Sequence, residues 1–148
     1  MVIGKYTDNI ISNQGVIYVI DNEKDIVTFV TSVLERNGYS VHSFTDSTEA
    51  LKDIELNCSS KSKKKVHMII TDIRMPEVNG FEIARRVQAI NSDIPIVFIT
   101  AFEINSSEFH QLFPSLQVNE FLQKPFHIQK LIDTVKKYDS AAIATYHQ

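Results

Sequence analysis

Short apolar runs rich in β-branched residues alternate with segments of helical periodicity, and this alternation constrains the fold more than any other feature. The first run, 16–20, reads VIYVI without a polar position, which is typical of a strand covered on both faces of a parallel sheet. Further strands are predicted at 41–44, 66–71, 94–99 and 121–122. Since a helical segment follows each strand, right-handed crossovers place helices on both faces of one parallel sheet. The sequence predicts a doubly wound α/β domain.

Capping residues indicate where several of the helices begin and end. Asp46 with Glu49, and Asn105 with Glu108, are two pairs that can cap a helix start, and Gly38 should end the first helix. The apolar stripes of the other helical segments are predicted over 26–34, 83–90 and 128–135. We expect an N-terminal extension, one domain and a C-terminal tail, with the boundaries 1–15, 16–138 and 139–148.

Composition excludes several classes of protein. The 148 residues are 43% hydrophobic, enough to bury the core of a single domain. A formal net charge of -3 argues against binding to nucleic acid or to anionic membranes through bulk charge, and the lysines of 61–65 are interpreted as a solvated loop. The single cysteine, Cys58, excludes an internal disulfide and a cysteine-built metal site. No apolar run approaches the roughly 20 residues of a membrane helix and no signal peptide is evident, so a cytoplasmic location is expected.

Polar residues stand where the strands end, and in a parallel sheet all these ends share one edge, where ligands bind. The residues are Asp21, Asn22, Glu23, Asp72, Thr100 and Lys124. Each alone is ordinarily a turn former or a helix cap. Together, the carboxylates would raise one another's pKa unless Lys124 or a divalent metal compensates their charge. Oxygen ligands suit Mg²⁺, and a carboxylate beside Mg²⁺, a hydroxyl and an ammonium can accept a phosphoryl group.

Four motifs, in order and at these spacings, closely resemble the receiver domain of two-component response regulators, of the chemotaxis-regulator type. The motifs are VIYVIDNEKDI, MIITDIRMPEVNGFEIARR, IPIVFITA and FLQKPF. The resemblance covers 16 to about 138. It implies a doubly wound (βα)5 flavodoxin-like three-layer sandwich with strand order 2-1-3-4-5. It also implies a signalling phosphoacceptor that assists its own phosphorylation and dephosphorylation, and that turns over no free metabolite as an enzyme would.

The resemblance also assigns roles to individual residues. Asp72 would be the phosphoacceptor, Lys124 would contact the phosphate, Thr100 would be the switch hydroxyl and Phe121 the switch aromatic residue. The cofactor would be Mg²⁺ or Mn²⁺. Its ligands would be Asp21, Asn22, Asp72 and the backbone carbonyl of Arg74, with Glu23 as an additional ligand.

Two departures from the family pattern affect these expectations. The second of two adjacent acidic residues is replaced by Asn22, whose amide can bind Mg²⁺ but brings no charge, and Glu23 could compensate. The interval between Thr100 and Lys124 is about two residues longer than usual and contains Pro114, so the helix within it should be short, kinked or displaced.

A shield for the phosphoryl group is also expected. Phe102 and Arg74, each two residues past a site residue, should lie at the mouth of the site and obstruct the hydrolytic water.

The expected partners are a histidine kinase or phosphotransfer protein, and a downstream protein or a missing output domain, with no direct contact to nucleic acid or membrane. A homodimer could form through the face made by the helix near 105–113, the strand 121–122 and the helix 128–135. Asn22 favours one alternative, a receiver-shaped interaction module that is independent of phosphate. A hydrolase or a flavodoxin-like cofactor binder is disfavoured, because the acidic segment DNEKD would repel a phosphate group.

Overall fold

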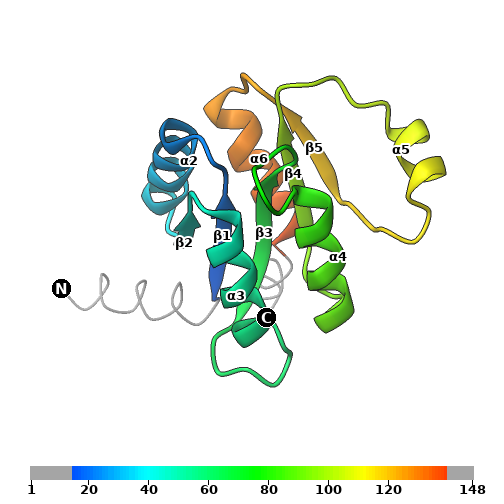
Figure 1. Cartoon of the computed structure of the whole chain (residues 1–148). Helices are drawn as coiled ribbons and strands as arrows, with labels where there is room; N and C mark the ends of the chain where they lie inside the picture. The colour runs from blue at the N-terminus through cyan, green and yellow to red at the C-terminus, as the bar shows by residue number, and fades with distance from the viewer. Residues whose placement is uncertain (1–14, 140–148) are drawn as a thin grey trace.

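Five parallel strands form one sheet in the order β2-β1-β3-β4-β5 in the computed structural model, which describes residues 15–139 (Figure 1). The strands are β1 (Val16–Ile20), β2 (Ser40–Phe44), β3 (Val66–Asp72), β4 (Ile96–Thr100) and β5 (Glu120–Gln123). The helices are α2 (Lys24–Arg36), α3 (Ser47–Asn57), α4 (Gly80–Ile90), α5 (Ser106–Leu112) and α6 (Ile128–Tyr138). The predicted (βα)5 architecture and strand order are confirmed.

The largest error in the predicted strand boundaries is at the start of β4; other strand ends differ by at most one residue. β4 begins at Ile96, and not at Ile94. Pro95 has no amide hydrogen to donate to a neighbouring strand, although its carbonyl accepts the amide of Ile69 at 3.0 Å. The predicted N-terminal extension and C-terminal tail lie almost entirely outside the described residues. Within the described part of the chain, no helix is both long and apolar enough to cross a membrane.

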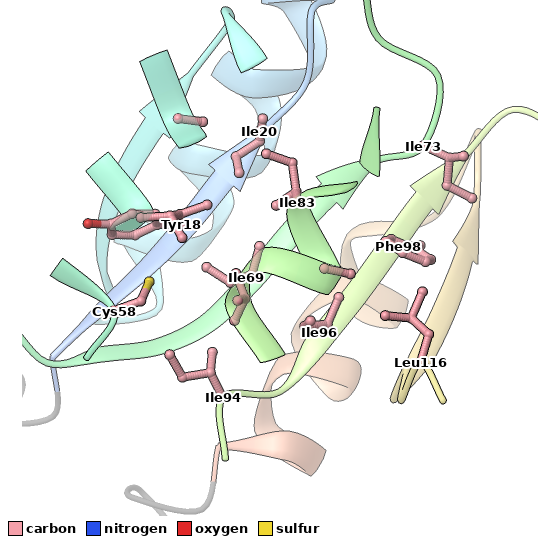
Figure 2. Close-up of a cluster of buried hydrophobic side chains, with 14 of the residues drawn as sticks. Tyr18, Ile20, Cys58, Ile69, Ile73, Ile83, Ile94, Ile96, Phe98 and Leu116 are labelled. Atoms are coloured by element: carbon pink, nitrogen blue, oxygen red, sulfur yellow. The ribbon is translucent and has the colours of Figure 1, made fainter. Parts of the chain in front are cut away.

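Two hydrophobic clusters lie on opposite faces of the sheet. On one face, α2 and α6 pack through residues such as Val30 and Leu131. On the other face, α3, α4 and α5 contribute to a cluster that includes Ile69, Ile83 and Phe98. Figure 2 shows these three side chains. Alternate residues of β1 enter alternate clusters, as expected for a strand covered on both sides.

Side-chain caps fix the starts of three helices. Asp46 and Asn105 each accept two backbone amides at the first turn of α3 and α5, as predicted. Asn79 caps α4 in a capping box with Glu82, whereas the sequence indicated only a turn at Asn79. Gly38 has φ 90° and follows Asn37, the C-cap of α2, which confirms the predicted helix end.

The helix α5 has seven residues, so the prediction of a short helix is confirmed. It is attached through a group of phenylalanine rings from α4, β4, α5 and β5 with centroids between 4.9 and 6.2 Å apart. The group comprises Phe81, Phe98, Phe109, Phe113 and Phe121. A helix this short has few residues with which to contact the sheet, so the packing of these aromatic rings holds it in place.

Both ends of the described domain lie at the amino edge of the sheet. Val16 begins β1 there, and the hydroxyl of Tyr138, at the end of α6, donates to the carbonyl of Asn119 just before β5. The opposite, carboxyl edge is built from the residues that directly follow the strands, and it carries the candidate site.

Candidate functional site at the carboxyl edge of the sheet

Acidic residues that follow β1 or end β3 converge on the ammonium group of Lys124, which follows β5. Lys124 Nζ lies 2.7 Å from Asp21 Oδ2, 2.9 Å from Glu23 Oε1 and 3.3 Å from Asp72 Oδ2. Asp21 is fully buried and Asp72 is 7% exposed, so two of these carboxylates are nearly removed from solvent. The predicted convergence of acidic residues on one lysine is therefore present in the fold.

The end of β3 and the following loop hold Asp72 in place. Asp72 Oδ1 accepts the amide of Ile73 at 2.7 Å, and the amide of Gly80 donates to the carbonyl of Ile73 at 2.7 Å. A Cβ atom at Gly80 would overlap the carbonyl oxygen of Asp72, so the loop can return this closely only through a glycine. Ser47, 4% exposed, also fixes the loop, because its hydroxyl donates to the carbonyl of Pro76 at 2.9 Å.

The sequence did not reveal these supporting roles of Gly80 and Ser47. The spacing of Asn79 and Glu82 is a capping signal that could have placed Gly80 at the start of α4. Ser47 offered no comparable signal, because its contact joins residues 29 positions apart.

Backbone contacts position the lysine and the first carboxylate. The amide of Lys124 donates to the carbonyl of Thr100 at 2.6 Å, which ties the end of β5 to the end of β4. Asp21 Oδ1 accepts the amide of Glu23 at 2.8 Å, so the turn after β1 fixes this carboxylate. Asp21 Oδ2 has an ionic contact with Lys124 but no well-directed hydrogen bond among the described residues.

The site holds more acidic than basic side chains. Burial, and then the charge of Asp21, raise the pKa of Asp72, although Lys124 and the Ile73 amide act in the opposite direction. Burial opposes the charge of Lys124, but its close contacts with Asp21 and Glu23 raise its pKa to about 12. The ammonium therefore stays charged at neutral pH and faces three carboxyl groups.

The donor set fits a hard divalent cation. One carboxylate oxygen from each of Asp21, Glu23 and Asp72 lies within 4.8 Å of the others. Asp21 Oδ2, buried and without a directed hydrogen bond, has the free lone pairs that a metal ligand needs. The side chain of Asn22 is exposed. Glu23 is therefore the residue that adds a third carboxylate to the cluster.

The structure also describes the remaining predicted residues. Thr100 is 2% exposed, and its Oγ1 accepts the amide of Phe102 at 3.2 Å. The guanidinium carbon of Arg74 lies 4.1 Å from the centre of the Phe102 ring, and that ring is 49% exposed. Phe121 is half-buried among the phenylalanines of the neighbouring group.

Comparisons with known proteins agree with this geometry. The family described as "Response regulator receiver domain" matches residues 17–136. Response regulator SaeR of Staphylococcus epidermidis is 31% identical over 114 residues, which are 77% of this chain and 45% of that protein. The response regulator receiver protein CpdR of Brucella abortus is 30% identical, covering 85% of this chain and 98% of that protein. The chain spans about half the length of SaeR and nearly all of CpdR.

Solved structures with similar folds include a response regulator receiver domain protein of Clostridium thermocellum. Its TM-score is 0.72 at 26% identity, covering 88% of this chain and 98% of that chain. The Thermotoga maritima response regulator TrrA, solved in complex with Mg²⁺ and BeF, has a TM-score of 0.68 at 26% identity, covering 84% of this chain and 98% of that chain. On its sequence, its strand order and the match over residues 17–136, this chain belongs to the response regulator receiver domain family.

Proposed function

We propose that this domain accepts a phosphoryl group on Asp72 from a histidine kinase or a phosphotransfer protein. The observation that carries the proposal is the contact of Lys124 with Asp21, Glu23 and Asp72 at the carboxyl edge. Because Asp72 Oδ1 is occupied by the Ile73 amide, Oδ2 is the oxygen available to attack phosphorus. The phosphorus–nitrogen bond of the donor breaks as the bond to Oδ2 forms, and the donor imidazole keeps the electron pair.

Each neighbouring group has a role in that transfer. Lys124 stays charged and lies on the Oδ2 side of Asp72, where it can hold a phosphoryl oxygen. Thr100 ends the adjacent strand and can donate its hydroxyl to another phosphoryl oxygen. The half-buried position of Phe121 beside Phe109 provides a route by which a movement of Thr100 could reach α5.

A divalent cation, Mg²⁺ or Mn²⁺, completes the proposed site. Asp21, Asp72 and the backbone carbonyl of Arg74 would hold it, with Glu23 or Asn22 adjusting the fit. The ion would neutralise charge that develops on the phosphoryl oxygens. The three clustered carboxylates support this assignment, as does the presence of Mg²⁺ in the similar Thermotoga maritima regulator.

The proposal extends to the surroundings of the domain. Residues 16–138 would form the receiver unit, acting in the cytoplasm on a downstream protein or through an output domain. The face made by α5, β5 and α6 would be available for a homodimer.

The test is labelling of the protein with acetyl phosphate in the presence of Mg²⁺. Acid-labile label should appear on the unmodified chain and be lost in Asp72→Asn. Asp93→Asn, which alters an exposed aspartate away from the site, is the matched control and should label normally. Full labelling of Asp72→Asn would contradict the assignment. A folded unmodified chain that takes up no label would instead favour the phosphate-independent interaction module that Asn22 suggests.

A further inference from the structure

A second polar cluster lies between α3 and the strands β1 and β2, and the proposed function does not use it. Its centre is Asp53 of α3, whose side chain is 20% exposed. The hydroxyl of Tyr18 and the side-chain amide of Asn57 both donate to Asp53 Oδ1. His42 and Lys64 approach the same carboxylate from β2 and from the loop before β3. Asp53 Oδ2 lies 3.6 Å from His42 Nδ1, and Lys64 Nζ lies 3.9 Å from Asp53 Oδ1.

The contact between Lys64 and His42 defines a protonation state. Lys64 Nζ lies 2.8 Å from His42 Nδ1, and a charged ammonium can only donate hydrogen bonds. His42 Nδ1 must therefore be the unprotonated acceptor nitrogen of a neutral imidazole. A proton on Nδ1 would remove the acceptor and place two cations 2.8 Å apart, beside a carboxylate that can pair with either of them.

The titratable groups of this cluster, besides His42, are Tyr18 from β1, Asp53 from α3, Cys58 at the end of α3 and Lys64 from the loop. Burial, and then the charge of Lys64, lower the pKa of His42 from its ordinary 6.5, while Asp53 opposes this shift. Burial also raises the pKa of Tyr18, and it raises that of Cys58 to about 12, so both stay uncharged.

The lysine end of this contact belongs to the basic loop, which we define as residues 58–65. Inside the loop, the amide of Ser62 donates to the carbonyl of Ser59 at 3.0 Å. At its end, the carbonyl of Lys65 accepts the amide of Val16 at 2.8 Å. Lys61 and Lys63 are exposed, whereas Lys64 is partly buried against Tyr18, with Nζ 5.2 Å from that ring centre. Lys64 is thus the lysine that fastens the basic loop to the sheet.

We propose that protonation of His42 exchanges the partner of Asp53, so that His42 replaces Lys64 and the basic loop is released from the sheet at mildly acidic pH. The 3.6 Å separation of His42 Nδ1 from Asp53 Oδ2 closes to a hydrogen bond with a small rotation of the ring. Lys64 then turns to solvent and joins the exposed lysines of the loop. This switch depends neither on Asp72 nor on a metal.

The experiment follows the full chain by NMR from pH 5 to pH 8 at constant ionic strength. The His42 ring resonances report its protonation, and hydrogen exchange of the Val16 and Ser62 amides, corrected for intrinsic rates, reports the attachment of the basic loop. Protection of these amides against exchange should fall about tenfold, the loss expected for one charge-assisted hydrogen bond. The midpoint of this fall should coincide with the midpoint of the His42 titration. The exposed His127 is an internal reference.

Two variants test the exchange of partners at Asp53, one by replacing His42 and one by replacing Lys64. In His42→Gln, the side-chain oxygen can still accept from Lys64 but cannot take a proton, so protection should stay high at every pH. In Lys64→Met, the His42 midpoint should rise while that of His127 stays fixed, and protection should be low throughout. Protection that stays level across the His42 titration, or a His42 midpoint that is the same in Lys64→Met, would overturn the proposal.

Discussion

Replacing Lys124 with methionine should destabilise the domain in a strongly pH-dependent way. The Lys124 side chain is 10% exposed, and those of Asp21 and Asp72 are 0% and 10% exposed, so the change leaves two buried carboxylates without their cation. Removing one partner of a buried ion pair costs about 3–5 kcal/mol. We expect the lower end of this range at pH 7, because Asp72, whose pKa burial already raises, can take up a proton in the variant.

The pH dependence follows from the charge of the carboxylates. At low pH Asp72, whose pKa burial raises, takes up a proton, Lys124 then contributes less, and the variant should approach the stability of the unmodified chain. Urea unfolding followed by circular dichroism at pH 4, 5.5 and 7 measures this difference. Lys130→Met is the control, because Lys130 is 59% exposed and lies 3.7 Å from Glu120, a pair worth less than about 1 kcal/mol. The reasoning would be refuted if both variants lost the same free energy of unfolding at pH 7. It would also be refuted if Lys124→Met lost the same free energy of unfolding at pH 4 and at pH 7.

Four further changes test the site. Asn22→Asp should bind Mg²⁺ more tightly in calorimetric titration, and unchanged or weaker affinity would place residue 22 outside the metal shell. Phe102→Ala should speed loss of the phosphoryl group from labelled protein, because the ring stacked on Arg74 would no longer obstruct the attacking water; an unchanged rate would remove Phe102 as the shield. Gly80→Ala should cost about 1–3 kcal/mol in urea unfolding, since the added Cβ overlaps the carbonyl oxygen of Asp72, and a neutral effect would show that the loop adjusts. Asp72→Asn should raise the free energy of unfolding at pH 7 but not near pH 4. Because the folded state raises the pKa of Asp72, ionisation of this carboxyl group destabilises the fold as pH rises through that pKa; a gain of equal size at both pH values would contradict this prediction.

The sequence was sufficient to predict the sheet and most of the candidate site, for a physical reason. Apolar runs and helical stripes are local signals, and a parallel sheet then brings every strand end to one edge. Asp21, Asp72 and Lys124 therefore meet although 51 and 52 positions separate the consecutive pairs. The side-chain cap at Asn105 was equally local and was predicted correctly.

Features that depend on tertiary contact were not predictable in this way. The Ser47 hydroxyl reaches Pro76 only after α3 and the loop behind β3 are in place. The cluster around Asp53 draws on Tyr18, His42 and Lys64, whose sequence positions share no pattern or spacing. The start of β4 was displaced by Pro95, where hydrophobicity favoured a strand but hydrogen bonding did not allow one.

The placement of both ends of the described domain at the amino edge has a practical consequence for handling the protein. A five-residue strand such as β1 spans about 17 Å, so an anchor attached beside Val16 or Tyr138 stands roughly that far from the carboxylates at the opposite edge. Immobilisation on a sensor surface, or fusion to a reporter, at either end would leave the reacting face turned outward. Interaction measurements on tethered protein should therefore report binding at Asp72 without interference from the attachment.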